Sequence, residues 1–388
     1  MPYLPIIKDS KFLEYGADIG AIVVHASHIL WRPSLLPAVQ AEHEVIIDIE
    51  TNRCVTTDAH KSTNYKDLPY CLNETELPQI MADSTFRLQR LVEPAVQFQV
   101  DNGSAIVMAP YLMFGDWRSR TFSVNLELVA DVINHAEGQS HGKPLYAVIN
   151  LSSDILKSVD GTSYVKDRYL EFSDHVEGYV IIPDSLTDDK ADVGTLMNLA
   201  RLVHGLKTAG KKVLVFPIGG FGLVLQAVGA THYGSGIFGK ESSSVAMFDS
   251  EGNGFSRQDR WIYDPHIYEY VNAVALANAG HTCSCTACDG GVAGTLALKK
   301  QHDALVRNEL GKALMSLPED QRLHFMHDQL EAAARRVRAY ERDDFGPKNS
   351  QYLERWLAVV EAAMSWPATV EEDDGLLDDL LKEIDEEA

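Results

Sequence analysis

Short runs of apolar and β-branched residues alternate with helical stretches over the first 240 residues of the chain. Most of these runs are continuously apolar, which is typical of strands that are buried on both faces of a parallel sheet. Eight strands that are separated by helices predict a (β/α)8 TIM-type barrel, an α/β fold, and a doubly wound open sheet is the alternative. The expected strands are 3–7, 19–25, 45–49, 105–109, 145–151, 179–183, 213–217 and 232–237.

Helical periodicity predicts the remaining organisation of the chain. Residues 239–282 contain turn clusters and are expected to be irregular. We expect a barrel at 1–282, a zinc-binding subdomain with a helical extension at 283–366, and an acidic amphipathic tail at 367–388. The clearest helices are expected at 84–98, 124–135, 193–209, 302–316, 318–341 and 351–365.

The charge of the chain is strongly negative. The 388 residues include 34 Lys and Arg against 56 Asp and Glu, a formal charge of −22, and the tail is particularly rich in acids. A nucleic-acid binder usually has a basic face, so such a role needs a local basic patch or a basic partner. Leucines recur at helical spacing among the acids of the tail, which is either a solvated segment or a helix that docks on a protein partner.

Hydropathy and the first residues of the chain bear on its location. No stretch approaches the roughly 18 apolar residues that are needed to span a bilayer. The first residues lack the basic region and apolar core of a secretory signal. We therefore expect a cytoplasmic protein without membrane association, and an oligomer remains open.

Three of the five cysteines lie within six residues, as Cys283, Cys285 and Cys288. A disulfide framework is usually spread out and even in number, whereas a cluster of this kind indicates a metal in a reducing compartment. Zinc prefers four N or S ligands in a tetrahedron. We expect His302 as the fourth ligand, because His281 is too near the knuckle to complete a good tetrahedron. A closed site of this kind is structural, and the alternative is a chance cluster of free thiols.

The other two cysteines, Cys54 and Cys71, lie far from this cluster in the sequence. They have no visible partners, so we interpret them as ordinary buried thiols.

The sequence Cys-Ser-Cys-Thr-Ala-Cys at 283–288, with Gln301-His302-Asp303 opening an amphipathic helix, resembles the zinc subdomain of tRNA-guanine transglycosylases. In that family the motif follows the last barrel strand. Residues 17–33, 45–48 and 103–109 resemble family strands in the same order, so the resemblance covers most of residues 1–315. The loop between the cysteines and the histidine is shorter here than is usual in the family.

The resemblance implies a (β/α)8 barrel and a base-exchange reaction. In the family, an aspartate on the last strand attacks C1′ of a guanosine, and a 7-deazaguanine such as queuine or preQ1 then displaces the enzyme. A second aspartate moves protons, and the resemblance places Asp48 at this acid/base position. Family members and their relatives act on tRNA or on DNA, so the resemblance implies one of these as partner.

The chain departs from the family pattern at several strand ends. Ile49-Glu50-Thr51 replaces Ser-Gly-Gly, and Pro110-Tyr111 replaces an aspartate that contacts the base. Residues 150–152 and 182–185 replace a Gln-Gly pair and a Gly-Gly-Leu-Ala loop. Ser235 stands where the family has its nucleophile, and a serine hydroxyl without a general base is a poor nucleophile.

Chemistry in a barrel takes place at the carboxyl ends of its strands. We take Asp48, Asp184 and Ser235 as catalytic candidates, and Asp48 and Asp184 as a carboxylate pair. Each has a structural alternative: Asp184 as a turn or N-cap residue, and Ser235 as a small packing residue. Other residues at expected strand ends are Glu50, Asn150, Ser185 and His232, the last of which is also typical of a core histidine.

Two functions follow from these patterns. The first is a divergent transglycosylase that exchanges guanine for a 7-deazaguanine in tRNA or DNA. The second is a non-catalytic, zinc-stapled barrel that serves as a scaffold in a larger complex and uses its acidic tail as a handle for a protein partner. Basic side chains at Arg335, Arg338 and Arg342 are either a solvated helix face or a phosphate-binding patch.

Overall fold

The computed structural model describes residues 2–7, 19–54, 64–138, 142–236, 261–278, 280–343 and 350–367. The acidic tail, apart from Pro367, lies outside the described residues. So does position 237, which was expected to end the eighth strand.

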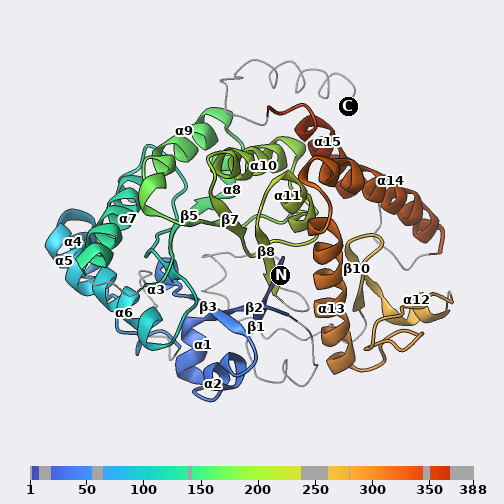
Figure 1. The fold of residues 1–388 in the computed structure, drawn as a ribbon, viewed down its shortest axis with the longest axis horizontal. Helices are drawn as coiled ribbons and strands as arrows, with labels where there is room; N and C mark the ends of the chain where they lie inside the picture. The colour runs from blue at the N-terminus through green and yellow to red at the C-terminus, as the bar shows by residue number, and fades with distance from the viewer. Residues whose placement is uncertain are drawn as a thin grey trace.

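Eight parallel strands form one sheet that curves into a nearly closed barrel with helices around it (Figure 1). The strand order is β3-β2-β1-β8-β7-β6-β5-β4. Between the two edge strands, the Ala105 amide donates to the Val45 carbonyl at 2.7 Å. The predicted (β/α)8 barrel is therefore confirmed. Its strands are β1 Tyr3–Ile7, β2 Ala21–His25, β3 Glu44–Asp48, β4 Val107–Met108, β5 Leu145–Ser152, β6 Gly178–Asp184, β7 Lys212–Val215 and β8 His232–Gly236.

Strand β4 has two residues where five were expected. The buried Gln99 side chain binds the backbone of Met108 in this strand. Its amide accepts from the Met108 N–H at 2.7 Å and donates to the Met108 carbonyl at 2.9 Å. A side chain from a neighbouring helix thus satisfies the backbone at this edge of the barrel.

Helices lie between the strands, and the helix that was expected at 84–98 is divided into three. A π-helix at Leu88–Val92 ends two residues before Pro94, which has no N–H to continue the regular ladder. The helices of the barrel are α1 Ala26–Trp31, α2 Leu35–Gln40, α3 Thr51–Cys54, α4 Leu77–Ala82, α5 Ser84–Arg87, α6 Glu93–Asp101, α7 Arg120–Gly138, α8 Ser153–Leu156, α9 Val159–Leu170, α10 Val193–Thr208 and α11 Gly222–Val228, with a 3-10 turn at Ser173–His175.

The expectation of an irregular segment at 239–282 is wrong for its described part. β9 Trp261–Asp264 and β10 Glu269–Asn272 form an antiparallel hairpin, and α12 Ala273–Asn278 follows it. Ile262, Tyr263 and Val271 are buried, so the hairpin has an apolar face of its own. Three long helices complete the fold and pack on one side of the barrel (Figure 1): α13 Leu296–Met315, α14 Glu319–Asp343 and α15 Gln351–Ala363.

The packing shows which strand residues face the interior of the barrel. Tyr233 faces the helices, because a Cβ on Gly222 of α11 would lie 2.1 Å from its ring. Tyr179 also faces the helices, since its hydroxyl donates to the carbonyl of Tyr169 in α9 at 2.9 Å. Neighbouring residues on a strand point to opposite sides, and paired residues on adjacent strands share a side. The sides on which these two tyrosines lie therefore show, through the register, which residues of the paired strands face the helices and which face the interior.

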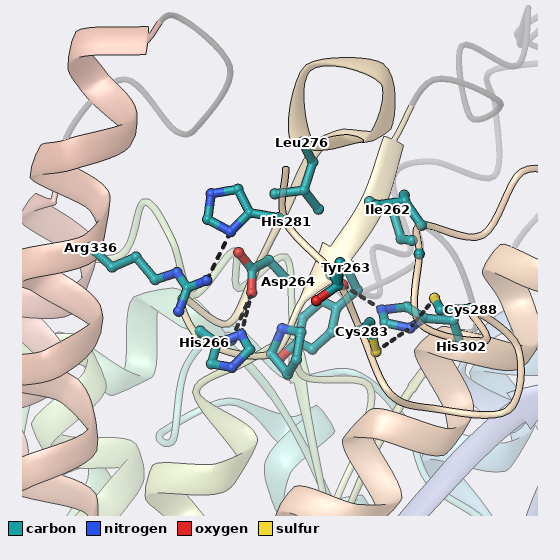
Figure 2. A pocket seen from close by; sticks show the side chains of 14 residues that line it. Ile262, Tyr263, Asp264, His266, Leu276, His281, Cys283, Cys288, His302 and Arg336 are labelled. Carbon is teal, nitrogen blue, oxygen red and sulfur yellow. Dashed lines mark hydrogen bonds and ion pairs between the residues drawn. The ribbon is translucent and has the colours of Figure 1, made fainter. Parts of the chain in front are cut away.

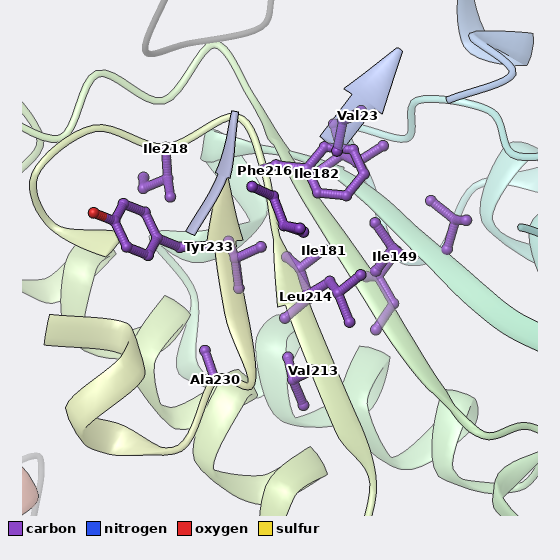
Figure 3. Packing of buried hydrophobic residues seen from close by; sticks show 14 of the residues in the cluster. Val23, Ile149, Ile181, Ile182, Val213, Leu214, Phe216, Ile218, Ala230 and Tyr233 are labelled. Atoms are coloured by element: carbon purple, nitrogen blue, oxygen red, sulfur yellow. The ribbon is translucent and has the colours of Figure 1, made fainter. Parts of the chain in front are cut away.

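Apolar side chains fill the barrel wall and its helix layer. Figure 3 shows Ile149 of β5 with its partner Ile181 of β6, and Leu214 of β7, whose side chain points to the opposite side of the sheet. All three are at most 2% exposed. Among the described residues, no helix is long and apolar enough to cross a bilayer.

Candidate metal centre and barrel mouth

Cys283, Cys285, Cys288 and His302 converge on one point, and their ligand atoms all lie within 4.8 Å of one another. His302 Nδ1 lies 3.6, 3.2 and 3.3 Å from the three sulfur atoms in that order. A tetrahedral ion with bonds of 2.0–2.3 Å places its ligand atoms roughly 3.5 Å apart. The four side chains that the sequence predicts thus fit one metal ion.

Backbone hydrogen bonds form the knuckle that presents the three sulfurs. The Cys283 N–H donates to the Gly291 carbonyl, and the Gly290 N–H donates back to the Cys283 carbonyl. The chain reverses at Asp289 and Gly290, whose φ angles are 47° and 80°. Glycine adopts this left-handed conformation without a steric cost, which allows the tight return.

His302 is oriented by the barrel-side hairpin. It lies within α13, and its Nε2 lies 2.7 Å from the carbonyl oxygen of Tyr263 in β9. A carbonyl acceptor at Nε2 fixes the tautomer that leaves Nδ1 free as a ligand. His302 and Cys288 are buried, at 2% and 8% exposure. This second contact is typical of histidines that bind metals.

Contacts among the three cysteine side chains shift the pKa values of Cys285 and Cys288. Hydrogen bonds from Cys283 and Cys288 lower the pKa of Cys285 to about 3, whereas hydrogen bonds with Cys283 and Cys285 raise the pKa of Cys288. Three sulfurs at this spacing cannot all be satisfied as thiols. A bound cation would stabilise all three as thiolates.

A buried ion pair lies next to the metal centre, one residue after His302 in α13. The Arg307 Nε donates to Asp303 Oδ1 at 2.6 Å, and both side chains are 0% exposed. The Tyr270 hydroxyl donates to the other Asp303 oxygen at 2.7 Å. The Arg307 guanidinium lies 3.9 Å from the centre of the Tyr263 ring. Tyr263 therefore contacts this pair through its ring and the metal ligand through its backbone.

An open pocket of about 360 Å³ lies beside the centre (Figure 2). Arg336 of α14 reaches His281 across it, at 3.1 Å between Nη2 and Nδ1. Asp264 contacts His266 at 3.0 Å on the same wall. His281, which the sequence places too near the knuckle to act as a ligand, thus pairs with an arginine.

A second polar cluster lies at the barrel mouth, at the carboxyl ends of β2 and β3. Tyr3 pairs with Tyr233 and shares its outward side, so Ile6 and its partner Val23 face inward. His25, two residues after Val23, faces inward as well, and so does its partner Asp48.

Asp48 is held by three neighbours. The Tyr111 hydroxyl donates to Oδ1 at 2.5 Å, the Glu50 N–H donates to the same oxygen at 3.0 Å, and His25 Nδ1 lies 3.1 Å from Oδ2. Burial alone would raise the pKa of Asp48, but His25, Tyr111 and the Glu50 amide outweigh it and hold the pKa below its ordinary value. The carboxylate is therefore ionised at neutral pH.

Glu50 is a second buried carboxylate, with a side chain that is 3% exposed. It accepts hydrogen bonds from the Ser27 hydroxyl at 2.5 Å and the Tyr65 hydroxyl at 3.0 Å, and Arg53 lies 3.4 Å away. Burial opposes its ionisation, but the charges of His25 and Arg53 and the Ser27 hydrogen bond hold its pKa below the ordinary value. Its φ of 49° is rare for a residue with a side chain, and such strain is typical of functional sites.

The pairing of β5 with β6 brings two more predicted residues to the interior. Tyr179 faces the helices, so Ile182 and Asp184 face inward, together with their partners Asn150 and Ser152. Asp184 is 4% exposed and accepts from the Ser185 hydroxyl at 2.8 Å. Asn150 is 0% exposed, and neither atom of its amide has a hydrogen-bond partner among the described residues.

Ser235 and His232 lie elsewhere. Ser235 shares the outward side of Tyr233, is 0% exposed, and lies 2.9 Å from the hydroxyl of Tyr3. His232 begins β8 at the amino end of the barrel, where burial and Lys212 lower its pKa to about 4. Both arrangements are those of structural residues, at positions away from the mouth.

Sequence reasoning missed His25, Ser27, Tyr65 and Tyr111 as members of the mouth cluster. Only His25 gave a usable signal, because His25 ends the predicted strand 19–25 and Asp48 lies one residue before the end of the predicted strand 45–49. The carboxylate beside Asp48 is Glu50: the same His25 nitrogen lies 3.1 Å from Asp48 and 3.4 Å from Glu50.

No protein-family model matches this chain, and a search of curated proteins finds no significant match.

Proposed function

We propose that this chain is a base-exchange transglycosylase that binds guanine or a 7-deazaguanine at the mouth of its barrel. The observation that carries the proposal is the ionised Asp48 cluster on the inward face, together with the bare amide of Asn150. An unpaired buried amide is costly unless a ligand satisfies it. Its donor and acceptor suit the polar edge of a purine.

In the proposed reaction, Asp48 is the acid/base and Asp184 is the nucleophile. An Asp184 oxygen forms a bond to C1′ as the bond from C1′ to the purine nitrogen breaks, and the departing base takes a proton from water. The ionised Asp48 then accepts the N–H proton of the incoming base as that nitrogen bonds to C1′ and the bond to Asp184 breaks, and the proton on Asp48 finally returns to the hydroxide that the first step left in solution. Asp184 is proposed because it faces inward at a strand end, whereas Ser235 faces the helices.

We propose zinc for the metal centre. Three sulfurs and one imidazole form a donor set that zinc prefers, and four protein ligands leave no position for substrate. Zinc would then stabilise the hairpin and α13, and it would take no part in the base exchange.

The second candidate function is a non-catalytic scaffold. It is favoured by the position of Ser235, which the Tyr3 contact removes from the mouth. In this case the Asp48 cluster serves only to hold the loops after β2, β3 and β4, and the acidic tail at 367–388 would be the handle for a protein partner.

The deciding experiment measures incorporation of labelled guanine and preQ1 into tRNA and into duplex DNA by the metal-loaded full chain. We expect incorporation that is lost in Asp48→Asn and in Asp184→Asn, and kept in Asp154→Asn, a change at an exposed residue. Equilibrium dialysis with guanine tests base binding separately. Folded, metal-loaded protein that neither binds nor incorporates the base would exclude the transglycosylase and support the scaffold.

A further inference from the structure

Cys54 and Cys71, which the sequence leaves as isolated thiols, lie next to one another. Cys54 ends α3, and its carbonyl accepts from the Leu72 N–H at 3.1 Å. The Cys71 sulfur lies 3.8 Å from the same carbonyl oxygen. The two cysteines thus lie on adjacent chain segments, as a disulfide between them requires.

The two thiols differ in the way that a redox pair requires. Cys54 is fully buried, whereas Cys71 is partly accessible to solvent. The hydrogen bond with the Cys54 thiol lowers the pKa of Cys71, and burial raises the pKa of Cys54. Cys71 is therefore the more acidic and the more accessible of the two sulfurs, and Cys54 is the protected sulfur beside it.

The pair is connected to the barrel mouth through one helical turn. The Cys54 N–H donates to the Glu50 carbonyl at 3.1 Å, so Cys54 and Glu50 lie at the two ends of this turn. Tyr65 precedes Cys71 on the partner segment, and its hydroxyl donates to the Glu50 carboxylate. Both chain segments that carry the cysteines thus hold Glu50.

We propose that Cys54 and Cys71 are an oxidative modification site that forms a reversible disulfide in response to a peroxide. The Cys71 thiolate attacks one peroxide oxygen, which gives a sulfenic acid and releases hydroxide. The Cys54 thiol then attacks the Cys71 sulfur, the S–O bond breaks, and water leaves as the disulfide forms. Two thiols are oxidised, one peroxide is reduced to two waters, and a small dithiol reverses the change.

The disulfide closes a loop that contains Tyr65 and ends at α3. It therefore links both segments that hold Glu50. The two sulfurs must approach from hydrogen-bond contact to a covalent bond, and this approach shifts the turn that follows Asp48. On the function proposed above, we expect oxidation to weaken guanine binding on the order of tenfold, because small displacements at a binding site have large effects. The formation of the disulfide itself does not depend on that function.

The test treats the metal-loaded full chain with hydrogen peroxide at low excess, followed by alkylation and peptide mapping. We expect a peptide pair joined through Cys54 and Cys71, unchanged metal content, and full reversal by dithiothreitol. Cys71→Ser is the matched control, since it changes one atom at a partly exposed position and should fold. Its Cys54 should stay reduced, and its base binding should not respond to peroxide.

Two results would overturn the proposal: sulfinic acid on Cys71 without a linked peptide, or two thiols that remain alkylatable while peroxide ejects the metal. A linked peptide in a protein that binds no base would keep the disulfide and exclude the transglycosylase function. Cys54→Ala provides a second check, because its Cys71 should then advance beyond the sulfenic acid.

Discussion

The metal centre and the barrel mouth are both polar sites in a largely apolar interior. Their residues are spread over very different lengths of sequence. The four metal ligands fall between positions 283 and 302. The mouth combines His25, Asp48 and Tyr111 with Asn150 and Asp184, which come from separate strands and loops. The first site depends on one knuckle and one helix, whereas the second depends on the register of the whole barrel. A local site can be located from spacing, and a distributed site requires the fold.

The two sites also differ in what they need from a ligand. The metal centre places four donor atoms around one point, so its folding free energy includes the free energy of metal binding. The Asp48 cluster satisfies its own charges through neighbouring hydroxyls, an amide and an imidazole. We therefore expect metal removal to unfold one region, and mouth substitutions to change chemistry with smaller losses of stability.

Metal removal should have the largest effect. We expect one zinc per chain by elemental analysis, and a large fall in melting temperature with a strong chelator or in Cys285→Ser. Structural zinc contributes on the order of 10 kcal/mol in small zinc-dependent folds. Cys71→Ser, a thiol change outside the ligand group, should keep its zinc. If the metal-free chain kept its melting temperature, metal binding would not contribute to folding. The two sites would then not differ in their need for a ligand.

Breaking the buried ion pair between Asp303 and Arg307 should have the second largest effect on stability. Asp303→Asn removes the carboxylate charge that the buried Arg307 guanidinium contacts, and we expect a loss of about 3–5 kcal/mol in the free energy of unfolding. The measurement is denaturant unfolding of the metal-loaded protein. Glu331→Gln removes the partner of exposed Arg335 and should cost at most about 1 kcal/mol. Equal losses in the two variants would contradict the role of burial here.

Tyr111→Phe tests the mouth cluster. Loss of a hydroxyl that donates to a buried carboxylate should cost about 1.5–3 kcal/mol near neutral pH. The pKa of Asp48 is lowered by folding, so its contribution is complete above the unfolded value of 3.8 and is lost as pH falls through the folded value. The variant raises the folded pKa toward 3.8, and its deficit should shrink below about pH 4. A deficit that is independent of pH would show that Tyr111 acts only by packing.

His232→Gln should have the smallest effect on the free energy of unfolding. His232 lies at the amino end of the barrel, opposite the mouth. The pKa of His232 is lowered from 6.5 to about 4, so its stabilising contribution is present above 6.5 and is lost as pH falls toward 4. Across that window the shift corresponds to at most about 3 kcal/mol, and because the residue is only half-buried we expect the wild type to lose about 1–2 kcal/mol more than the variant. Exposed His324 provides the control substitution. Identical pH profiles for wild type and His232→Gln would contradict the burial of this ring.

The sequence was sufficient for the barrel because its strands are buried on both faces. β5 and β6 follow the predicted runs closely, since their apolar pattern matches their surroundings. β4 is shorter than expected, and the Gln99 side chain that binds its backbone is a contact that no local pattern predicts. The hairpin at 261–272 escaped prediction because its short strands lie among turn residues.

The same reasoning explains which site residues could be predicted. The spacing of Cys283, Cys285 and Cys288 carries its own geometry, and the helix supplies His302. The partners of Asp48 are set by strand register and by a loop after β4, and a single sequence contains neither. The contact between Cys54 and Cys71 has the same origin, because it depends on how residues 64–72 return to α3.

Strand β1 lies between β2 and β8 in the sheet, so the first strand of the barrel pairs with the eighth. During synthesis, one edge of β1 must wait until more than 200 further residues have left the ribosome. An unpaired apolar edge is a site for wrong association in the meantime. Folding intermediates of this protein should therefore be vulnerable at β1, and a chaperone that binds nascent chains should protect the β1 edge until β8 arrives.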